Sequence, residues 1–364
     1  MLDKKRVNLH APINECTTIN KSQTGALGIP ELMLPIQRRA FKVNKKRLYL
    51  GFCLVWLSLA ASSCKKVTLE RPYVWAEREL PAGQTERATE RVQGLAADLC
   101  VVDEAAQIPD EAINSEAAAV FNLTDKQTIY SKNAFEVLHP ASTTKIMTAL
   151  LAIKYGNLED EVTVTDAAVI DERGATLCDI HPGDVLTLEQ LLYGLMLPSG
   201  NDAGAAIAVH MAGDIDHFAE MMNEEAARLG ATSTHFTNPH GLTNQEHVTT
   251  AYDLYLIFNE ALKQPKFREV TGATAYTANY MSGDGQLVSK TWKGGNWFLT
   301  GERETPDGLT VFSGKTGTTN AAGYCLVMAS RDEQEKEYIS VVLKASSRPN
   351  LYDNMTQVIQ KIVN

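Results

Sequence analysis

The segment 140–148 reads Pro-Ala-Ser-Thr-Thr-Lys-Ile-Met-Thr, and apolar residues then recur at helical spacing as far as Tyr155. This periodicity predicts a helix over 143–155 that faces the protein core. Because residues three apart lie on one face of a helix, we expect the Lys145 amine beside the Ser142 hydroxyl. A serine becomes a strong nucleophile only when a base takes its proton, and a neutral lysine can be that base. The segment therefore predicts a candidate nucleophile and base at the start of a buried helix.

The Ser-x-x-Lys spacing is weak evidence when it is taken alone. The same spacing occurs at Ser62–Lys65 and at Ser63–Lys66, in a stretch where no active site is expected. A helix-capping serine followed by a solvated lysine is the structural alternative. Only the copy at Ser142 opens an apolar periodic helix, which favours a chemical role there.

Two further motifs place polar groups in tight links of the chain. The Ser-Gly-Asn motif at 199–201 joins two predicted helices, 188–197 and 202–211, and its structural alternative is a turn with a helix cap. The Lys-Thr-Gly motif at 315–317 follows a strand-like run, 309–312, so a peptide could lie beside it as an added strand near a positive charge. The end of a hairpin is the structural alternative for this third motif.

Strand-like and helical runs follow one another in a way that indicates one mixed domain. Strands are predicted at 117–122, 128–130, 309–312, 323–329 and 338–344, and further helices at 215–229, 251–262 and 352–363. Strands at both ends with helices between them predict a sheet whose first and last strands are neighbours, covered by a layer of helices.

The three motifs, taken together and in this order, resemble the set found in penicillin-binding proteins and class A β-lactamases. The likeness extends to the segments 140–148, 197–203, 222–230, 235–242 and 314–324, which resemble those of the low-molecular-weight D-alanyl-D-alanine carboxypeptidases, a family of serine peptidases. It covers about residues 98–364. The resemblance implies an α+β fold of the β-lactamase and DD-peptidase type. Its mainly antiparallel sheet of about five strands would have helices on both faces, with a helical lobe that carries the second motif.

The resemblance also implies a catalytic role for five motif residues. Ser142 would attack the peptide bond between the last two D-alanines, and Lys145 would take its proton. Ser199 would pass a proton to the leaving amine, and Lys315 would keep that network polarised. Asn201 would orient Lys145 and the substrate amide.

Other residues are implied in substrate binding. The backbone N–H groups of Ser142 and Thr318 would form the oxyanion hole, and Thr316 would help to bind the terminal carboxylate. Arg348 resembles a family arginine that assists with the same carboxylate, with a surface arginine as the alternative. The full set implied in binding is Gly200, Lys315, Thr316, Gly317, Thr318 and Arg348. The resemblance implies neither a cofactor nor a metal.

Several reactive or aromatic side chains outside the motifs are expected to have structural roles. His240 and His247 lie in family-like stretches, but lysine is the base in this mechanism. For Trp292 and Trp297, packing is favoured over the lining of a groove. The cysteines of the exported part are expected to be buried free thiols: Cys100, Cys178 and Cys325.

The composition is that of a globular protein. The chain has 364 residues, 44% hydrophobic and 21% charged, which excludes collagen-like, coiled-coil and mostly disordered chains. Residues 1–47 hold ten Lys/Arg and three Asp/Glu and 48–64 hold none, so the overall charge of −10 leaves −17 on residues 65–364. Such an acidic body argues against nucleic acid or an anionic lipid surface as a partner. Six cysteines without a Cys-x-x-Cys pair argue against a disulfide scaffold or a metal site.

The N-terminal region is typical of an exported protein. A basic cluster at 45–47 precedes an uncharged run, 48–64, whose 17 residues match a signal-peptide apolar region. Met33 would begin a more usual signal peptide and is a candidate for the true start. Cys64 follows small residues and resembles the lipidated cysteine of bacterial lipoproteins, with plain cleavage near 60–63 or an uncleaved anchor as alternatives.

Three regions are therefore predicted along the chain. Residues 1–64 form an extension and leader, the polar stretch 65–97 a flexible tether, and 98–364 the catalytic domain. About 16 residues follow Arg348, too few for the C-terminal β-rich domain that often occurs in this family. We expect the catalytic domain outside the cytoplasm, in a bacterial cell envelope, attached to the membrane at its N-terminus or by lipid on Cys64.

The resemblance predicts a serine D,D-carboxypeptidase that removes the terminal D-alanine from peptidoglycan stem pentapeptides and that β-lactams acylate on Ser142. A β-lactamase is one alternative. It needs a general base for deacylation, and Glu224 and Glu225 are the candidates in the intervening stretch. A non-catalytic lipoprotein that binds wall peptides is the other alternative. The three intact motifs favour the peptidase.

Overall fold

The structure is a computed structural model that describes residues 98–363. The predicted leader and tether, 1–64 and 65–97, lie outside the described residues. Between residues 98 and 363, no helix is both long enough and apolar enough to cross a membrane.

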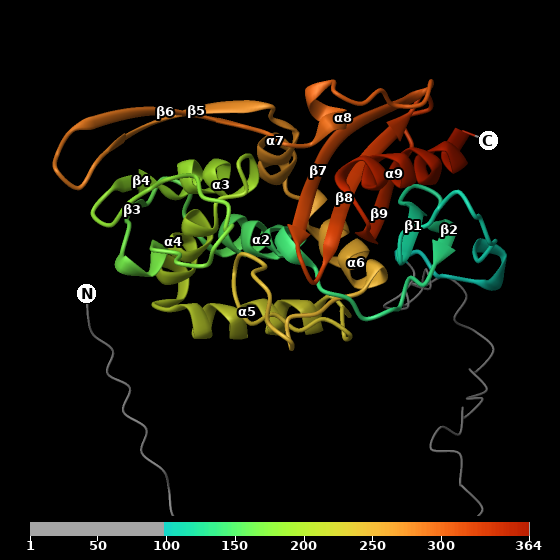
Figure 1. Ribbon diagram of the computed structural model, residues 1–364, viewed down its shortest axis with the longest axis horizontal. Coiled ribbons are helices and arrows are strands. Elements are labelled where there is room, and N and C mark those ends of the chain that lie inside the picture. The colour runs from blue at the N-terminus through green and yellow to red at the C-terminus, as the bar shows by residue number, and fades with distance from the viewer. Residues whose placement is uncertain (1–97, 364) are drawn as a thin grey trace, which may run out of the picture. The chain divides into compact units, whose positions relative to one another are not determined.

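A five-stranded antiparallel sheet forms the centre of the described domain (Figure 1). Its strands are β1 (Ala117–Asn122), β2 (Gln127–Lys132), β7 (Leu309–Thr319), β8 (Gly323–Asp332) and β9 (Glu337–Ala345). Their order is β2-β1-β9-β8-β7, and β1 pairs with β9 so that Ala119 lies opposite Val341. The predicted pairing of the first and last strands is therefore confirmed, as is the α+β fold.

Both faces of this sheet are buried, because successive side chains of a strand point to opposite sides. Ala119 and Phe121 of β1 join the core that contains α6 (Ala251–Leu262), and Phe121 stacks on Tyr255 with 4.1 Å between ring centroids. Val120 joins a second core against α9 (Arg348–Val363). The predicted helices on both faces are thus confirmed.

Most of the remaining helices form the lobe beside the sheet. The remaining helices are α2 (Lys145–Tyr155), α3 (Leu188–Met196), α4 (Asn201–Ala212), α5 (Ile215–Arg228), α7 (Pro265–Gly272) and α8 (Trp297–Thr300), with short 3-10 turns η1 (Glu104–Ala106), η2 (Ala141–Thr144) and η3 (Asp166–Ala168). Of these, α8 packs against β7 and α9, and η1 lies against β2. A capping box of Thr187 and Gln190 begins α3. Helix α2 lies among α3, α4 and α6, and its residues 145–152 are all buried. This central helix comes from the segment with which the sequence analysis began.

Two boundaries differ from the prediction. The helix expected over 143–155 begins as the 3-10 turn η2, so Ser142 lies in that turn and Lys145 is the first residue of α2. The third motif, predicted to follow a strand, lies inside β7, where Gly317 pairs with Cys325 of β8. A hydrogen-bonded partner strand holds the Thr- and Gly-rich segment extended, although its composition alone suggests a turn.

A second sheet was not predicted. It contains β3 (Glu161–Thr163), β4 (Val185–Thr187), β5 (Ala275–Met281) and β6 (Leu287–Lys293), in that order. Figure 1 shows the β5–β6 hairpin as a long ribbon above α3, and Tyr276 of β5 stacks on Tyr193 of α3. The other strands are only three residues long and the hairpin is mostly exposed, so no apolar alternation marks this sheet in the sequence.

A buried ion-pair cluster joins α5 to α2. The Glu225 carboxylate is 4% exposed and accepts hydrogen bonds from Arg228 Nη2 at 2.6 Å, Lys154 Nζ at 3.0 Å and the Tyr155 hydroxyl at 3.1 Å. The hydrogen bonds from Arg228 are the main cause that lowers the pKa of Glu225 to about 2. Ionised Glu225 therefore stabilises the folded state.

Replacing Glu225 by Gln tests this cluster. The variant removes the buried carboxylate, while Lys154 and Arg228 keep Glu260 as a partner at 3.5 Å, and we expect it to lower the free energy of unfolding at pH 7 by about 2 kcal/mol. In the wild type, ionised Glu225 contributes its full stabilisation above the pKa that this carboxyl has in the unfolded chain, near 4.5. This stabilisation is lost as the pH falls toward 2, the pKa of Glu225 in the folded protein. Urea unfolding at pH 7 and pH 3 measures both effects. Glu224→Gln, at the exposed neighbouring position, should unfold like the wild type, and an equal loss in both variants would contradict the prediction.

Candidate active site

The Lys145 amine lies at the centre of the three motifs. Its Nζ is 3.0 Å from Ser142 Oγ, 2.6 Å from Asn201 Oδ1 and 2.6 Å from the backbone carbonyl oxygen of His240. The side chain is wholly buried. Burial lowers the pKa of Lys145 well below its usual value, and the nearby positive charge of Lys315 lowers it further. The site thus favours the neutral amine, the form that can accept a proton.

A second lysine–serine pair faces this centre from the other motifs. Lys315 Nζ on β7 is 3.0 Å from Ser199 Oγ and 2.9 Å from the carbonyl oxygen of Thr316. Burial lowers the pKa of Lys315 to about 7. Ser199 lies in the link between α3 and α4, with a φ of 67°, a backbone conformation that non-glycine residues seldom adopt. The structure therefore brings the second and third motifs together.

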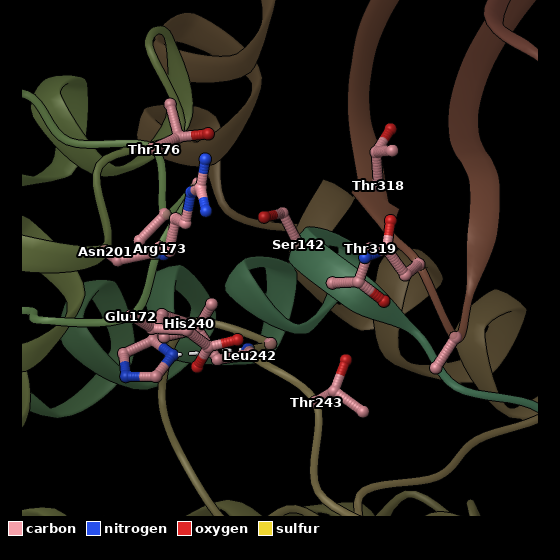
Figure 2. Close-up of a pocket in the computed structure, with 15 residues that line it drawn as sticks. Ser142, Glu172, Arg173, Thr176, Asn201, His240, Leu242, Thr243, Thr318 and Thr319 are labelled. Carbon is pink, nitrogen blue, oxygen red and sulfur yellow. Dashed lines mark hydrogen bonds between the residues drawn. The ribbon is translucent and has the colours of Figure 1, made fainter. Parts of the chain in front are cut away.

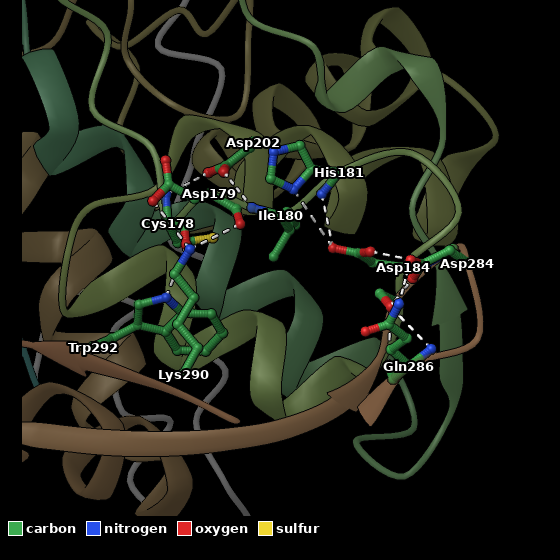
Figure 3. A network of polar contacts seen from close by, with 12 residues as sticks. Cys178, Asp179, Ile180, His181, Asp184, Asp202, Asp284, Gln286, Lys290 and Trp292 are labelled. Carbon is green, nitrogen blue, oxygen red and sulfur yellow. Dashed lines mark hydrogen bonds and ion pairs between the residues drawn. The ribbon is translucent and has the colours of Figure 1, made fainter. Parts of the chain in front are cut away.

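Asp202, the second residue of α4, ties this helix to the loop that contains Cys178 and Ile180 (Figure 3). Its carboxylate accepts hydrogen bonds from the backbone N–H groups of Cys178, at 2.9 Å, and Ile180, at 3.1 Å. The Trp292 indole donates to the Cys178 carbonyl oxygen at 2.9 Å, which ties β6 to the same loop. Trp292 is 3% exposed, so its predicted role in packing is confirmed. These bonds fix the start of α4, and with it Asn201.

His247 supports the turn that carries the nucleophile. Its Nδ1 accepts the Thr237 backbone N–H at 3.0 Å, and its Nε2 lies 2.7 Å from the hydroxyl of Thr144, which donates to the Ala141 carbonyl oxygen. Burial lowers the pKa of His247 to about 3, so the ring is neutral and can donate from Nε2. Ala141 has a φ of 49°, and this chain of bonds holds it there. The predicted structural role of His247 is consistent with these contacts.

His240 contributes its backbone rather than its ring. Its carbonyl oxygen accepts from Lys145, and burial lowers the pKa of the imidazole to about 3. The next residue, Gly241, has a φ of 88°, and a Cβ there would lie 1.9 Å from the Ala141 carbonyl oxygen. Only glycine allows the two backbones to meet so closely.

A cleft of about 520 Å³ opens over Ser142 (Figure 2). Asn201 lines it, together with three segments, 172–176, 240–243 and 318–321. Figure 2 shows Thr318 on one side of the Ser142 hydroxyl and Thr176 on the other. The loop 172–176 was missed in the sequence because an exposed polar loop has no periodic pattern.

Strand β7 lies at the edge of its sheet and borders the turn η2. A Cβ on Gly317 would lie 2.8 Å from the Ser142 backbone nitrogen. The free edge of β7 can pair with an extended peptide, which would then pass directly over the nucleophile.

Of the six residues predicted to bind substrate, Thr318 lines the cleft, and Lys315, Thr316 and Gly317 precede it on β7. Arg348 and Gly200 lie on other elements. Arg348 is exposed at the start of α9, with its guanidinium carbon 5.9 Å from the centre of the Trp297 ring. Gly200 is buried, and a Cβ there would lie 2.6 Å from Asp202 Oδ1, so close packing explains this glycine.

The other reactive side chains do not face the cleft. The free thiols of Cys100, Cys178 and Cys325 are all buried, as predicted. Burial raises the pKa of Cys325 to about 12, so this thiol is not a nucleophile. Glu225 belongs to the ion-pair cluster, and neither Glu224 nor Glu225 lines the cleft.

A serine beside a buried amine, under an edge strand that can pair with a peptide, defines a serine peptidase of the penicillin-binding class. The comparisons with known proteins agree with this assignment. The chain belongs to the D-alanyl-D-alanine carboxypeptidase family, whose sequence profile matches residues 103–347. The predicted family resemblance is therefore confirmed.

Individual relatives match the same part of the chain. D-alanyl-D-alanine carboxypeptidase DacF of Bacillus subtilis is 32% identical over 253 residues, which are 68% of this chain and 62% of DacF. The D-alanyl-D-alanine carboxypeptidase of Streptomyces sp. strain K15 is 34% identical over 249 residues, 64% of this chain and 81% of the relative. The crystal structure of the Streptomyces K15 DD-transpeptidase matches with a TM-score of 0.64 and 32% identity, covering 70% of this chain and 98% of the other.

Gly317→Ala tests the approach of β7 to the nucleophile. The new Cβ would push the Ser142 backbone away, and a displacement of about 1 Å in an active site costs roughly a hundredfold in rate. We expect acylation by a fluorescent penicillin to slow by that factor, while the melting temperature changes by only a few degrees. Gly295→Ala, where a Cβ meets nothing within 4 Å, is the matched control. If Gly317→Ala is acylated at the wild-type rate, the close approach of residue 317 to the Ser142 backbone has no catalytic importance.

Proposed function

We propose that the protein is a serine D,D-carboxypeptidase that removes the terminal D-alanine from peptidoglycan stem pentapeptides. The observation that carries the proposal is the set of three oxygens around Lys145 Nζ. A neutral amine has two hydrogens and one lone pair. Asn201 Oδ1 and the His240 carbonyl oxygen are acceptors and can take the two hydrogens. The lone pair then remains for the Ser142 hydroxyl proton.

Acylation follows from this arrangement. Lys145 takes the proton as Ser142 Oγ attacks the carbonyl carbon of the penultimate D-alanine. The backbone N–H groups of Ser142 and Thr318 stabilise the oxyanion. The C–N bond breaks, and Ser199, polarised by Lys315, passes its proton to the leaving D-alanine and receives in return the proton that Lys145 took from Ser142. The product is an ester between Ser142 and the shortened peptide.

Water completes the reaction. It adds to the ester carbonyl and gives up a proton, which returns the Ser142 hydroxyl and releases a tetrapeptide with a new carboxylate. The terminal carboxylate of the substrate binds near Thr316, Thr318 and the charged form of Lys315, and Arg348 assists from the start of α9. A β-lactam acylates Ser142 by the same first step.

The two alternatives receive less support. A β-lactamase of the glutamate-dependent type would need Glu224 or Glu225 near the ester, and neither lines the cleft. A non-catalytic wall-binding protein would have no need of a buried neutral lysine, which is costly to maintain.

The reaction is placed outside the cytoplasm, at the cell wall. We propose attachment through the N-terminal region, either by the apolar run 48–64 or by lipid on Cys64. Mass spectrometry of the N-terminus of protein extracted from membranes tests the attachment. A mature protein that begins at residue 61 or later and carries no lipid on Cys64 would contradict both forms.

Ser142→Ala tests the nucleophile. We expect it to lose labelling by fluorescent penicillin and to release no D-alanine from a stem pentapeptide, because it removes the hydroxyl that lies 3.0 Å from the Lys145 amine. Ser233→Ala, at an exposed position, should behave like the wild type. Persistent labelling of Ser142→Ala would assign the nucleophile elsewhere. Rapid release of the label, without D-alanine production, would favour the β-lactamase.

The pH dependence of acylation tests Lys145 as the base. Only the neutral amine accepts a proton, so the acylation rate should rise with pH and level off well below pH 10.5, the usual pKa of lysine. The positive charge of Lys315 lowers the pKa of Lys145, so Lys315→Gln should move the midpoint to higher pH and also slow the reaction. Second-order rate constants between pH 5 and pH 10 give both midpoints. A midpoint unchanged in Lys315→Gln would show that the two amines are not coupled.

A further inference from the structure

The wall of the cleft opposite β7 carries charges that the three motifs do not use. The loop 172–176 forms this wall, and Figure 2 shows Arg173 across the Ser142 hydroxyl from Thr318. Glu172 and Arg173 supply the charged side chains among the residues that line the cleft. Both side chains are exposed to solvent there.

The loop is attached firmly to the catalytic elements. The carbonyl oxygen of Thr176 accepts the Asn201 backbone N–H at 2.8 Å, and the carbonyl oxygen of Glu172 accepts the Ala175 N–H at 3.0 Å. The Asp202 carboxylate holds the next residues, beginning with the backbone of Cys178. These bonds hold the backbone of the loop beside Ser142 and leave the two charged side chains free to meet a ligand.

Neither charge is neutralised within the protein. In the part of the chain from 98 to 363, neither the Glu172 carboxylate nor the Arg173 guanidinium takes part in an ion pair or a hydrogen bond. Most other arginines of the domain have such a partner, as Arg228 has in Glu225 and Arg268 in Glu337. A guanidinium binds a carboxylate through two parallel hydrogen bonds, and a carboxylate binds an ammonium. Together they suit a ligand that carries both groups.

The proposed function shows where such a ligand would come from, and the inference rests on it. With the reacting carbonyl at Ser142 and the terminal carboxylate along 315–318, the peptide continues beside β7, and the long side chain of the residue before the two D-alanines can extend across the cleft toward the opposite wall. In stem peptides the side chain of this residue ends either in an ammonium alone, as in lysine, or in an ammonium and a carboxylate on one carbon, as in diaminopimelate.

We propose that Glu172 and Arg173 form a subsite for the amino-acid end of a diaminopimelate side chain. Glu172 binds the ammonium group, and Arg173 binds the carboxylate. The subsite makes Arg173 a specificity-determining residue, and diaminopimelate-type stem peptides the preferred substrates over lysine-type peptides.

Two pentapeptides that differ only in this residue test the subsite. The wild-type enzyme should release D-alanine from the diaminopimelate peptide with a kcat/KM about two- to fivefold above that for the lysine peptide, the size of one exposed ion pair. Arg173→Ala should abolish the preference by lowering kcat/KM for the diaminopimelate peptide alone. Glu172→Gln should lower kcat/KM for both peptides by a similar factor, because the lysine and the diaminopimelate side chain each carry an ammonium group. Lys263→Ala removes an exposed positive charge on another surface and should change neither value.

The outcomes separate the subsite from the proposed function. Equal kcat/KM values for the two peptides in the wild type would overturn the subsite, because Arg173 would then bind neither side chain. An equal loss of kcat/KM for both peptides in Arg173→Ala would also overturn it, because Arg173 would then bind a group that both peptides share. Competition of each peptide against labelling by fluorescent penicillin measures the binding of the peptide, whether or not it is hydrolysed. If neither peptide is hydrolysed, the carboxypeptidase proposal fails. The subsite would still be supported if the diaminopimelate peptide competes more strongly than the lysine peptide and this difference disappears in Arg173→Ala. It would still be overturned if the two peptides compete equally with the wild type.

Discussion

The burial of one amine sets the conditions for the rest of the active site. An ammonium taken out of water loses several kcal/mol of hydration unless charges or hydrogen bonds replace it. Lys145 is wholly buried among uncharged acceptors, and its positively charged neighbour, Lys315, makes protonation still less favourable. The protein thus keeps a base that is neutral at a pH where a solvated lysine would be charged. Three oxygens around the nitrogen then direct its lone pair toward Ser142.

Maintaining this geometry requires backbone conformations that are unfavourable in isolation. Ala141 and Ser199 both have positive φ angles, at the two turns that present the catalytic hydroxyls. Gly241 and Gly317 permit backbone approaches that a Cβ would block. Such strain persists only where the surrounding structure fixes it. Here the hydrogen bonds of His247 and Asp202 and the pairing of β7 with β8 provide that support.

The opposite walls of the cleft have different physical characters. On one side, the edge of β7 offers backbone groups that can pair with any extended peptide. This edge therefore positions the substrate through its backbone and does not select among its side chains. On the other side, the loop 172–176 presents side-chain charges over the same nucleophile. Backbone pairing supplies affinity, while unpaired side-chain charges supply discrimination. The two walls thus divide the tasks that we propose for the cleft, with β7 positioning the peptide and the loop 172–176 selecting among its side chains.

Local patterns were sufficient to identify the buried helix that follows Ser142, most of the other helices and the five strands of the central sheet. They were sufficient because apolar periodicity reflects burial on one side of an element. Order and spacing of the three motifs also indicated the family and placed Ser142 and Asn201 beside Lys145, whereas the contact with the His240 carbonyl oxygen was not predicted. Neither the polar β5–β6 hairpin nor the loop at Arg173 could be found in this way, because exposed segments carry no periodic signal. Only the tertiary structure brings residues 142, 199 and 315, which are far apart in the sequence, to one site. Only long-range packing removes the water that would otherwise keep Lys145 charged.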